Sequence, residues 1–582
     1  MLTSFSACML AAILGQIPAD SAWLKAIPDN VDVAIHSRGM EATQKDVVAM
    51  LKAMSPTLAD TAEPVLTNQL ATLENQFGAI VAKSPWVGVV KIAPGAPGGP
   101  PPFALLILKD DHEGILKGLS GGKELKLKHL ADGVDSFDAP QGNGTWFATK
   151  GAGFTAIGPD QPLITAIAKP TGKTLDKVLN EATAKPFLDG DLGLFVNVAA
   201  LASRYQDQID GARKGMITAL DQAAEQSGNA TSMESVKDIY GKLFDSIKYA
   251  DILTLDLDAA AKGLHIVGAL TAKADSDAAK AVAKGQAGDG GELAQFADDS
   301  AYYMYMNMSA DTIDSLMSMS LRMMSPTGKP SPEMEKARAL LREQGRIEAL
   351  GSVGFDKGMT AVTVSRVKDP KKYLEATQAI AQAMKNNKDA KSFVTDVKVE
   401  PDAQKYKGYS FTHIGTTMDF DKLAAQAGGA QGVAGMKSMY GGDTVHNWYG
   451  TDGEQILQIV APSWESAKKE LDSYLDTKGK IGATADYKEI RSQLPEKNSL
   501  LAIISAQGLA KLFATQLAAA ANKPDLKLPT DMPKEPALFG LSLAPKAPNA
   551  YEFHFILPSD VGAVIEKGFV PLFQSLQAPA AP

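Results

Sequence analysis

The sequence predicts an α+β fold that is internally duplicated, with mainly antiparallel sheets built of β-hairpins and helices packed on one face. Three observations lead to this prediction. A strand–helix unit recurs four times, a hairpin–helix unit recurs six times, and a Gly-rich polar segment divides the chain near its middle. Self-similarity of this kind indicates a repeated architecture, and hairpins followed by helices favour antiparallel sheets with helices on one face.

The strand–helix unit starts with a polar or acidic turn, continues as a short apolar strand and ends in a helix with amphipathic spacing. Its strands are predicted at 28–36, 189–198, 298–308 and 495–504, and the helices begin near 42, 199, 309 and 507. The hairpin–helix unit has its return strands at 103–108, 154–157, 264–271, 359–367, 455–461 and 551–557. Each return strand ends at an Asp, Ser or Pro at the start of the next helix.

Alternation along residues 252–258 predicts a strand with one exposed face. Leu253, Leu255 and Leu257 share one side, and Thr254, Asp256 and Asp258 share the other. In an antiparallel sheet such a pattern is typical of a strand whose polar side faces water. Asp256 and Asp258 could bind a cation from their shared face, but a solvated face is the favoured interpretation.

The domain prediction has three parts: a signal peptide at 1–22, a first α+β half at 23–285 and a second α+β half at 286–582. The residues at 285–292 form a flexible polar linker by composition. The apolar run Ala7–Leu14 is too short to span a bilayer and matches the apolar region of a secretory signal, although no Lys or Arg precedes it. An ordinary buried first helix is the alternative. If the true start lay upstream, Cys8 could be lipidated.

Composition excludes several classes of function. The chain has 582 residues, with 58 Lys and Arg against 67 Asp and Glu, for a net charge of −9. This balance argues against a sequence-independent nucleic-acid binder, which needs clustered basic residues. A single cysteine rules out an intrachain disulfide and Cys-based zinc, iron–sulfur or redox sites. No segment after the N-terminus is apolar and long enough for a transmembrane span.

The turns that open the strand–helix units carry a family resemblance. They read Ile27-Pro28-Asp29-Asn30, Asp298-Asp299-Ser300-Ala301 and Leu494-Pro495-Glu496-Lys497. In this the chain resembles an uncharacterised family of large exported bacterial proteins, a domain of unknown function with repeated units of this kind. The resemblance implies export and no known catalysis, and it brings no active-site residues with it.

Short catalytic motifs occur only in contexts that do not suit them. Gly118–Gly122 matches GxSxG, but a helix precedes it and a strand follows, which is the reverse of a nucleophile elbow. Gly151–Ala156 matches GxGxxA, but the segment predicts a hairpin turn and strand. The seven histidines are far apart in sequence. An enzyme would therefore need a dispersed site, in which several of His129, His265, His413 and His446, or the acidic faces of strands, converge.

Methionines form the one unusual enrichment. Met304, Met306 and Met308 alternate along a predicted strand, so their side chains project to one face while Tyr303 and Tyr305 face the other way. Thioethers are soft ligands for Cu(I), which makes this trio a candidate metal site. An adaptable core face is the favoured alternative, because Met fills irregular gaps.

The sequence therefore favours a non-catalytic exported protein that acts as a structural or binding module in the periplasm or at the cell surface. It implies no cofactor. The expected partner is another exported protein or a small ligand in a groove between the halves. Two alternatives stay open: a carrier of a hydrophobic ligand or soft metal, for which exposed Met304, Met306 and Met308 would be a sign, and an enzyme with a dispersed active site.

Overall fold

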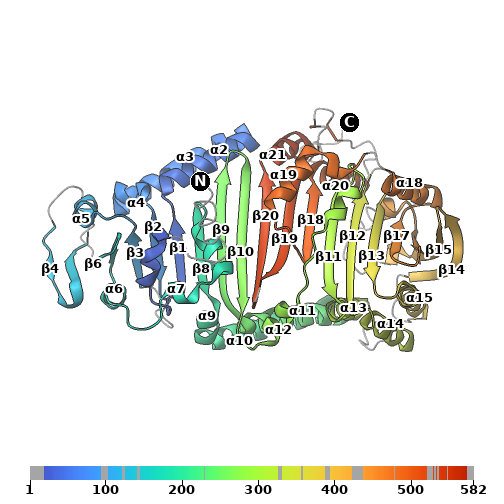
Figure 1. Ribbon diagram of the computed structural model, residues 1–582, viewed down its shortest axis with the longest axis horizontal. Helices are drawn as coiled ribbons and strands as arrows, with labels where there is room; N and C mark the ends of the chain where they lie inside the picture. Colours follow the sequence, from blue (N-terminus) through green and yellow to red (C-terminus); the bar gives the residue numbers. More distant parts are fainter. Residues whose placement is uncertain are drawn as a thin grey trace, which may run out of the picture. The chain divides into compact units, whose positions relative to one another are not determined.

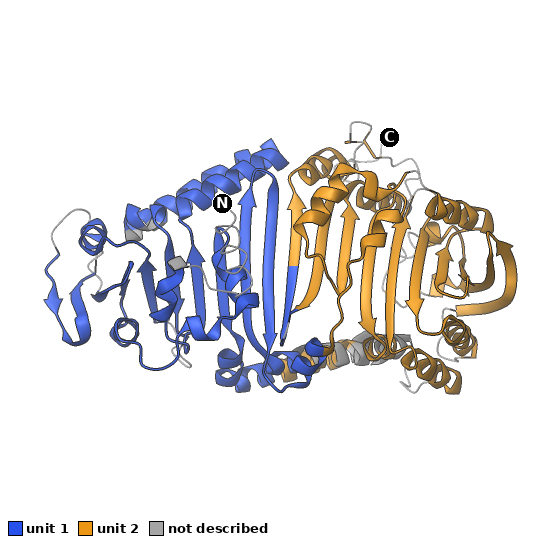
Figure 2. Cartoon of the chain, viewed as in Figure 1, with its two compact units in different colours: residues 1–211, 244–283, 546–553 blue, residues 212–243, 284–545, 554–582 orange. Residues whose placement is uncertain are grey.

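A computed structural model describes residues 19–92, 102–120, 125–139, 144–227, 230–324, 331–355, 358–386, 394–422, 437–476, 479–520, 528–529, 532–533, 536–546 and 548–572. The chain divides into two compact units (Figure 2). Unit 1 contains residues 1–211, 244–283 and 546–553, and unit 2 contains residues 212–243, 284–545 and 554–582. Most of the predicted signal peptide, including Cys8, lies outside the described residues.

Unit 1 contains ten strands among its described residues, each antiparallel to its neighbours (Figure 1). They are β1 (Val33–Ser37), β2 (Trp86–Val90), β3 (Phe103–Ile107), β4 (Lys128–His129), β5 (Val134–Asp138), β6 (Thr145–Gly151), β7 (Phe154–Gly158), β8 (Leu192–Asn197), β9 (Ala250–Ala260) and β10 (Gly263–Ala272). Hydrogen bonding places them in the order β4-β5-β6-β7-β3-β2-β1-β8-β9-β10.

Helices connect these strands. They are η1 (Ala19–Lys25), α2 (Met40–Met54), α3 (Pro56–Phe77), α4 (Ala79–Lys83), α5 (His112–Leu119), η2 (Ala131–Gly133), α6 (Gln161–Ala168), α7 (Leu175–Val178), α8 (Glu181–Leu188), α9 (Val198–Arg204) and α12 (Asp277–Lys284). Helices α10 (Gln206–Ser227) and α11 (Ala230–Tyr249) have residues in both units, and the last residue of α12, Lys284, belongs to unit 2.

The strands of unit 2 also pair antiparallel. They are β11 (Tyr302–Ser309), β12 (Arg346–Gly354), β13 (Thr360–Val367), β14 (Val394–Tyr406), β15 (Tyr409–Met418), β16 (Thr444–Thr451), β17 (Ile456–Val460), β18 (Leu500–Ser505) and β19 (Leu538–Lys546). The last residue of β19, Lys546, belongs to unit 1, and β20 (Ala550–Pro558) has residues in both units. Their order is β14-β15-β16-β17-β13-β12-β11-β18-β19. This order repeats that of unit 1 when ten is added to each strand number.

The helices of unit 2 follow corresponding strands. They are η3 (Gly291–Gln295), α13 (Ala310–Met324), α14 (Pro332–Arg342), α15 (Pro370–Asn386), α18 (Trp464–Leu475), η5 (Ile481–Ala483), α19 (Ala485–Gln493), α20 (Ala506–Ala520), α21 (Asp560–Val564) and η6 (Ile565–Phe569). The helix after the seventh strand of each unit, α6 or α18, begins at a capping residue in the predicted place. Asp160 accepts a hydrogen bond from Leu163 N (2.8 Å), and Ser463 accepts one from Ser466 N (3.2 Å).

Each unit has its main core on one face of its sheet. In unit 1 that face includes Ala34, Val87, Leu106 and Phe195, all fully buried against residues of η1, α6, α7 and α8. In unit 2 it includes Tyr303, Leu350, Leu457 and Ile503, buried with residues of η3, α18 and α19. Part of the opposite face is also covered, because Leu105 and Ile107 of β3 pack with α5 in a separate cluster.

The structure confirms the α+β prediction and the predominance of antiparallel pairing. The four predicted strand–helix units correspond to β1–α2, β8–α9, β11–α13 and β18–α20. Local sequence also explains the turn of the β6–β7 hairpin. Gly153 in this turn takes the left-handed φ of 80° that a tight turn needs. The Gly151–Ala156 segment is therefore a hairpin and not a nucleotide-binding turn.

Candidate functional site

One face of the sheet in unit 1 is apolar and only partly covered, and we call it the unit 1 open face. It consists of Val33, Ile35, Val90, Leu192, Leu194, Val196, Leu253, Leu255, Leu257, Ile266 and Leu270, whose side chains are half-buried or exposed. The most open are Ile35 and Leu270, at 36% and 42% of full exposure. None of these side chains carries a charge or a hydrogen-bonding group.

Strand register brings this set together. Residues directly opposite in an antiparallel pair lie on the same face of the sheet. Ile35 opposes Leu194, Leu194 opposes Leu255, and Leu253 opposes Leu270 in the next strand. The five neighbouring strands are β2, β1, β8, β9 and β10. At about 4.8 Å between strands, they make a surface about 20 Å wide.

The prediction that the polar side of β9 faces solvent is wrong. Thr254 is fully buried and Asp256 is 6% exposed, whereas Leu253, Leu255 and Leu257 lie on the open face. Alternation shows only that two sides differ, and the helices of this unit cover the polar side. Asp256 lies directly against Gly190, in the turn before β8, where a Cβ atom would come within 1.9 Å of the carboxylate Oδ1.

Unit 2 has a comparable surface, which we call the unit 2 open face. It consists of Tyr302, Met304, Met306, Met308, Val353, Leu500, Ala502, Ile504, Phe539, Leu541 and Leu543, again half-buried or exposed. Met304 and Leu541 are 41% and 39% exposed. Met304 opposes Ala502, and Ala502 opposes Leu541, so the surface is continuous across β11, β18 and β19.

The methionine trio lies on this open face, while the tyrosines between them lie in the core. Tyr303 and Tyr305 are fully buried, and Tyr303 donates a hydrogen bond to Ala297 O at 2.7 Å. Met304 is the most exposed of the three, and Met306 and Met308 are half-buried. The exposed-methionine sign of a carrier is therefore present at Met304. That the three sulfurs hold a soft metal stays a prediction.

A group of carboxylates surrounds Asp256 on the buried side of β8 and β9. Burial raises the pKa of Asp256 to about 7, and the charges of Asp258, Asp189 and Asp191 add to this. Asp191 accepts a hydrogen bond from Ala259 N (2.8 Å) and pairs with Arg38. Within the described ranges, no three His, Cys, Asp or Glu side chains are placed to share a metal ion. A carboxyl with so raised a pKa binds a proton more readily than an exposed aspartate does.

Two of the four histidines that a dispersed active site would need do converge. His413 of β15 and His446 of β16 lie 3.0 Å apart between Nε2 and Nδ1, and Glu400 of β14 contacts His413 Nδ1 at 2.8 Å. His129 is far more open, with a side chain 84% exposed beside Asp135 in unit 1, and His265 also belongs to unit 1. Sequence spacing could not reveal this cluster, because only strand register places Glu400 opposite His413.

A pocket of about 460 Å³ lies in unit 2. It is lined by Asp298, Asp299, Ser300, Thr484, Ser505, Gln507, Gly508, Lys511, Pro529, Met532, Pro533 and Pro536. Two of its polar side chains already serve the fold: Ser505 Oγ accepts from Gly508 N (3.1 Å), and Gln507 Oε1 accepts from Ala537 N (2.8 Å). In the described part of the lining, both side chains therefore hold local structure.

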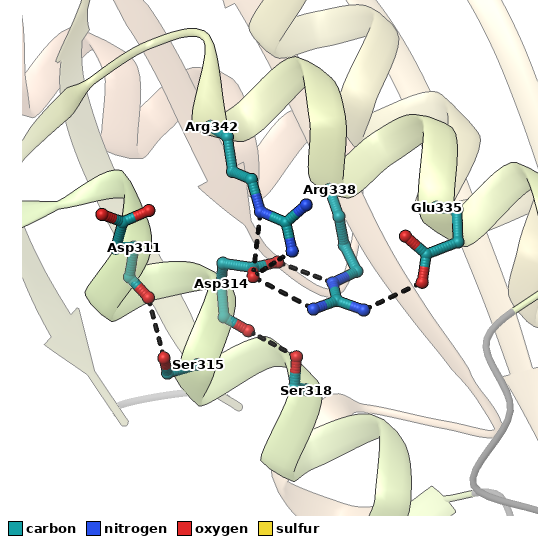
Figure 3. Close-up of polar contacts among 7 residues, drawn as sticks. All are labelled: Asp311, Asp314, Ser315, Ser318, Glu335, Arg338 and Arg342. Carbon is teal, nitrogen blue, oxygen red and sulfur yellow. Dashed lines mark hydrogen bonds and ion pairs between the residues drawn. The ribbon is translucent and has the colours of Figure 1, made fainter.

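The strongest charged cluster joins two helices (Figure 3). Asp314 of α13 accepts hydrogen bonds from Arg338 (2.6 and 3.0 Å) and Arg342 (3.1 and 2.6 Å) of α14. These guanidinium groups hold the pKa of the Asp314 carboxyl below its usual value. Arg338 also donates to Glu335 at 2.9 Å, one turn away on its own helix. This arrangement clamps α13 to α14.

The GxSxG motif does not form a nucleophile elbow. Ser120 is the C-cap of α5, and its hydroxyl donates to Lys117 O at 2.9 Å. The residues that follow, 121–124, lie outside the described part of the chain. In the described part, no helix is apolar and long enough to cross a membrane.

The chain matches no protein-family model, no curated protein and no solved structure. The resemblance to a family of large exported bacterial proteins therefore stays a prediction.

Proposed function

We propose that this protein is a non-catalytic exported binding module that takes apolar ligands of the acyl-chain class on its open faces. The observation that carries the proposal is an inversion of ordinary sheet design. Antiparallel sheets with one covered face normally turn polar side chains outward. Here Thr254 and Asp256 are buried, and Leu253, Leu255 and Leu257 are on the open side.

The energetic cost of these surfaces supports a binding role. Leaving a Leu or Met side chain in water forgoes about 1.5 to 3 kcal/mol compared with burying it. Contiguous exposed apolar patches of more than a few hundred Å² mark interaction sites in soluble proteins. Each open face joins side chains from at least three adjacent strands, so neither is a scatter of single exposed residues.

The chemistry of the open faces supports an acyl chain as the ligand. Apart from the hydroxyl of Tyr302, the side chains of both open faces contain nothing that pairs with a charged group, so the ligand should be apolar along the length that touches the sheet. Met304, Met306 and Met308 suit a ligand of variable shape, because thioether side chains adapt their rotamers. A bound acyl chain would cover residues such as Leu270 and Met304 that are now the most exposed.

The test is direct binding of a dansyl-labelled C16 fatty acid to the full chain, followed by fluorescence. Leu270→Lys and Met304→Lys each place a charge on one open face, at a position that is already exposed, so the fold should tolerate them. Each variant is expected to weaken binding to its own face by about tenfold or more, equivalent to about 1.4 kcal/mol.

Matched controls are Leu58→Lys in unit 1 and Leu475→Lys in unit 2. These leucines are 50% and 39% exposed but lie on α3 and α18, off the open faces. They should leave binding within twofold of the wild type. Absence of binding by the wild type, or equal losses in test and control variants, would contradict the proposal.

We also propose that the two units arose by internal duplication and that the protein is exported. The shared strand order supports duplication, since β1 to β9 correspond one by one to β11 to β19. Export rests on the apolar run Ala7–Leu14. The mass of the protein isolated from its own host tests export: loss of 1–22 would support it, and an untrimmed N-terminus in the cytoplasmic fraction would contradict it.

A further inference from the structure

Three strands of unit 2 are joined by a chain of side-chain hydrogen bonds. Glu400 of β14 lies opposite His413 of β15, and His413 lies opposite Trp448 of β16. His446 comes two residues before Trp448 and shares its face. The contacts run from Glu400 Oε2 to His413 Nδ1 (2.8 Å) and from His413 Nε2 to His446 Nδ1 (3.0 Å).

The rings are also stacked. The centroid of His413 lies 5.2 Å from those of both His446 and Trp448, with interplanar angles of 21° and 27°. Trp448 is buried and packs against Trp464 of α18. The two imidazoles are therefore held in one orientation by the core behind them, and the His413 side chain is only 14% exposed.

The charge of Glu400 determines where each proton lies. Lys398 contacts Glu400 at 2.7 Å, and together with His413 it holds the pKa of the Glu400 carboxyl below its usual value. An ionised carboxylate only accepts hydrogen bonds, so His413 Nδ1 carries the hydrogen. A neutral His413 then accepts at Nε2, His446 donates from Nδ1, and His446 Nε2 is left without a proton.

Because the hydrogens are arranged in this way, the hydrogen bond between His413 and His446 responds differently to a first and a second added proton. A proton added at His446 Nε2 leaves both hydrogen bonds intact, because His446 Nδ1 still donates to His413. A second proton would go to His413 Nε2, where two N–H groups would then face each other at 3.0 Å. Two stacked imidazolium ions would also repel, so the second proton must break the contact.

The hydrogen bonds among Glu400, His413 and His446 lie beside a place where backbone pairing of β14 with β15 is interrupted. The register of β14 against β15 shifts between Glu400 and Gln404, and Asp402 in the bulge has a left-handed φ of 50°. In the described residues β14 pairs with β15 alone, so it is held on one edge. A side-chain link at Glu400 therefore supplements the ladder beside one of its two register shifts.

We propose that Glu400, His413 and His446 form an acid-sensitive latch that tolerates one added proton and releases β14 from the sheet when a second is bound. The charged and titratable groups that face the two imidazoles are Glu400 and, through it, Lys398, both on β14; β16 contributes the uncharged ring of Trp448. The latch is independent of the open faces, because His413 and Trp448 lie on the side of the main core.

Hydrogen exchange of the full chain, measured by mass spectrometry from pH 7.5 to 4 and corrected for intrinsic rates, tests the latch. Protection of 394–418 is expected to stay constant while a single proton is added, then to fall about tenfold or more as the pH drops below the ordinary histidine pKa of about 6.5. Glu400→Gln removes the anion that orders the protons and should lower protection already at pH 7.5.

In His446→Gln the side chain cannot take up a proton, and its amide can donate to a neutral His413 or turn to accept from a protonated one, so opening should shift to lower pH than in the wild type. His129→Gln is the matched control, since this histidine also contacts a carboxylate but is exposed in unit 1, and it should change nothing at 394–418. Opening of His446→Gln at the wild-type pH, or full protection in Glu400→Gln, would refute the latch. So would nitrogen NMR shifts showing a protonated His446 Nε2 at pH 7.5.

Discussion

The two units treat buried ionisable groups differently. Among the described residues, unit 1 contains buried ionisable side chains with an atom that has no hydrogen-bond partner: Asp32 Oδ1, His36 Nδ1 and Asp256 Oδ1 are examples. In unit 2 the comparable buried atoms belong to Asn498 and Ser542, which carry no charge. The ionisable cluster of unit 2 at Asp314 is instead fully paired with arginines.

The contrast is clearest just before the first strand of each unit. Asn197 N donates to Asp32 O in unit 1, and Ser505 N donates to Ala301 O in unit 2, both at 2.8 Å. Unit 1 fills the space beside this bond with the Asp32–Arg204 ion pair. Unit 2 fills it by close packing, since a Cβ on Gly508 would lie 2.4 Å from Ala301 Cα. One strand arrangement thus accepts either a buried charge pair or tight apolar contact.

This difference predicts that two buried groups make the stability of unit 1 depend on pH: His36 at mildly acid pH and Asp256 at neutral to basic pH. The larger effect is expected for Asp256. Because its folded pKa is about 7 against 3.8, the folded state binds the proton more tightly, and stability falls as pH rises from about 4 to about 8. Asp256→Asn should stabilise unit 1 at pH 8 by up to about 4 kcal/mol. Hydrogen exchange of β8 and β9 measures this.

The matched control is Asp277→Asn, because the Asp277 side chain is 90% exposed in the same unit. It should leave exchange of β8 and β9 unchanged at both pH 4 and pH 8. Equal protection of Asp256→Asn and wild type at pH 8 would contradict the prediction, because it would show that ionisation of Asp256 does not lower the stability of unit 1.

For His36 we expect the stability of unit 1 to change with pH in the opposite direction. His36 is buried, stacks on Trp23 at 5.8 Å, and burial lowers its pKa to about 4. The unfolded state then binds the proton more tightly, so stability falls as pH drops from 6.5 to 4, by about 3 kcal/mol. His36→Phe keeps an aromatic ring on Trp23 and should abolish this acid slope in urea unfolding followed by exchange of β1. An unchanged slope would contradict the prediction.

Substitution of Asp314 measures how much its ion pairs with two arginines contribute to the stability of unit 2. Asp314→Asn leaves Arg338 and Arg342 without their anion and should cost about 2 kcal/mol in the local stability of α13 and α14. Since pairing lowers the Asp314 pKa, its contribution is present at neutral pH and is lost as pH falls below about 3.8. Glu335→Gln, at a side chain 50% exposed with one contact to Arg338, should cost under about 0.5 kcal/mol. Comparable losses in both would contradict a clamp centred on Asp314.

The smallest effect is expected at Ser542, a neutral buried group. Its hydroxyl is fully buried without a partner, so Ser542→Ala should change the free energy of unfolding by less than about 1 kcal/mol, in the stabilising direction. Ser505→Ala is the comparison, because that hydroxyl caps α20 through Gly508 N and its loss should cost about 1 kcal/mol. Thermal unfolding of both variants distinguishes them, and a destabilised Ser542→Ala would contradict the assignment.

Strand and helix positions were largely predictable, because local patterns encode them. The Asp160 and Ser463 caps and the Gly153 turn are read from short stretches of sequence. The candidate surfaces were only partly predictable. Alternation placed Met304, Met306 and Met308 on one side of a strand, but core packing was the favoured interpretation, and Met304 is 41% exposed.

The sequence by itself determined the α+β class, the element order and which side chains share a side of each strand, because periodicities of 2 and 3.6 residues are local properties. Tertiary structure alone decided which side of β9 is covered, and so why Asp256 is buried and Leu255 lies on an open face. It also decided that Glu400, His413 and His446 meet. These are matters of strand register and helix placement, which depend on contacts between residues far apart in the chain.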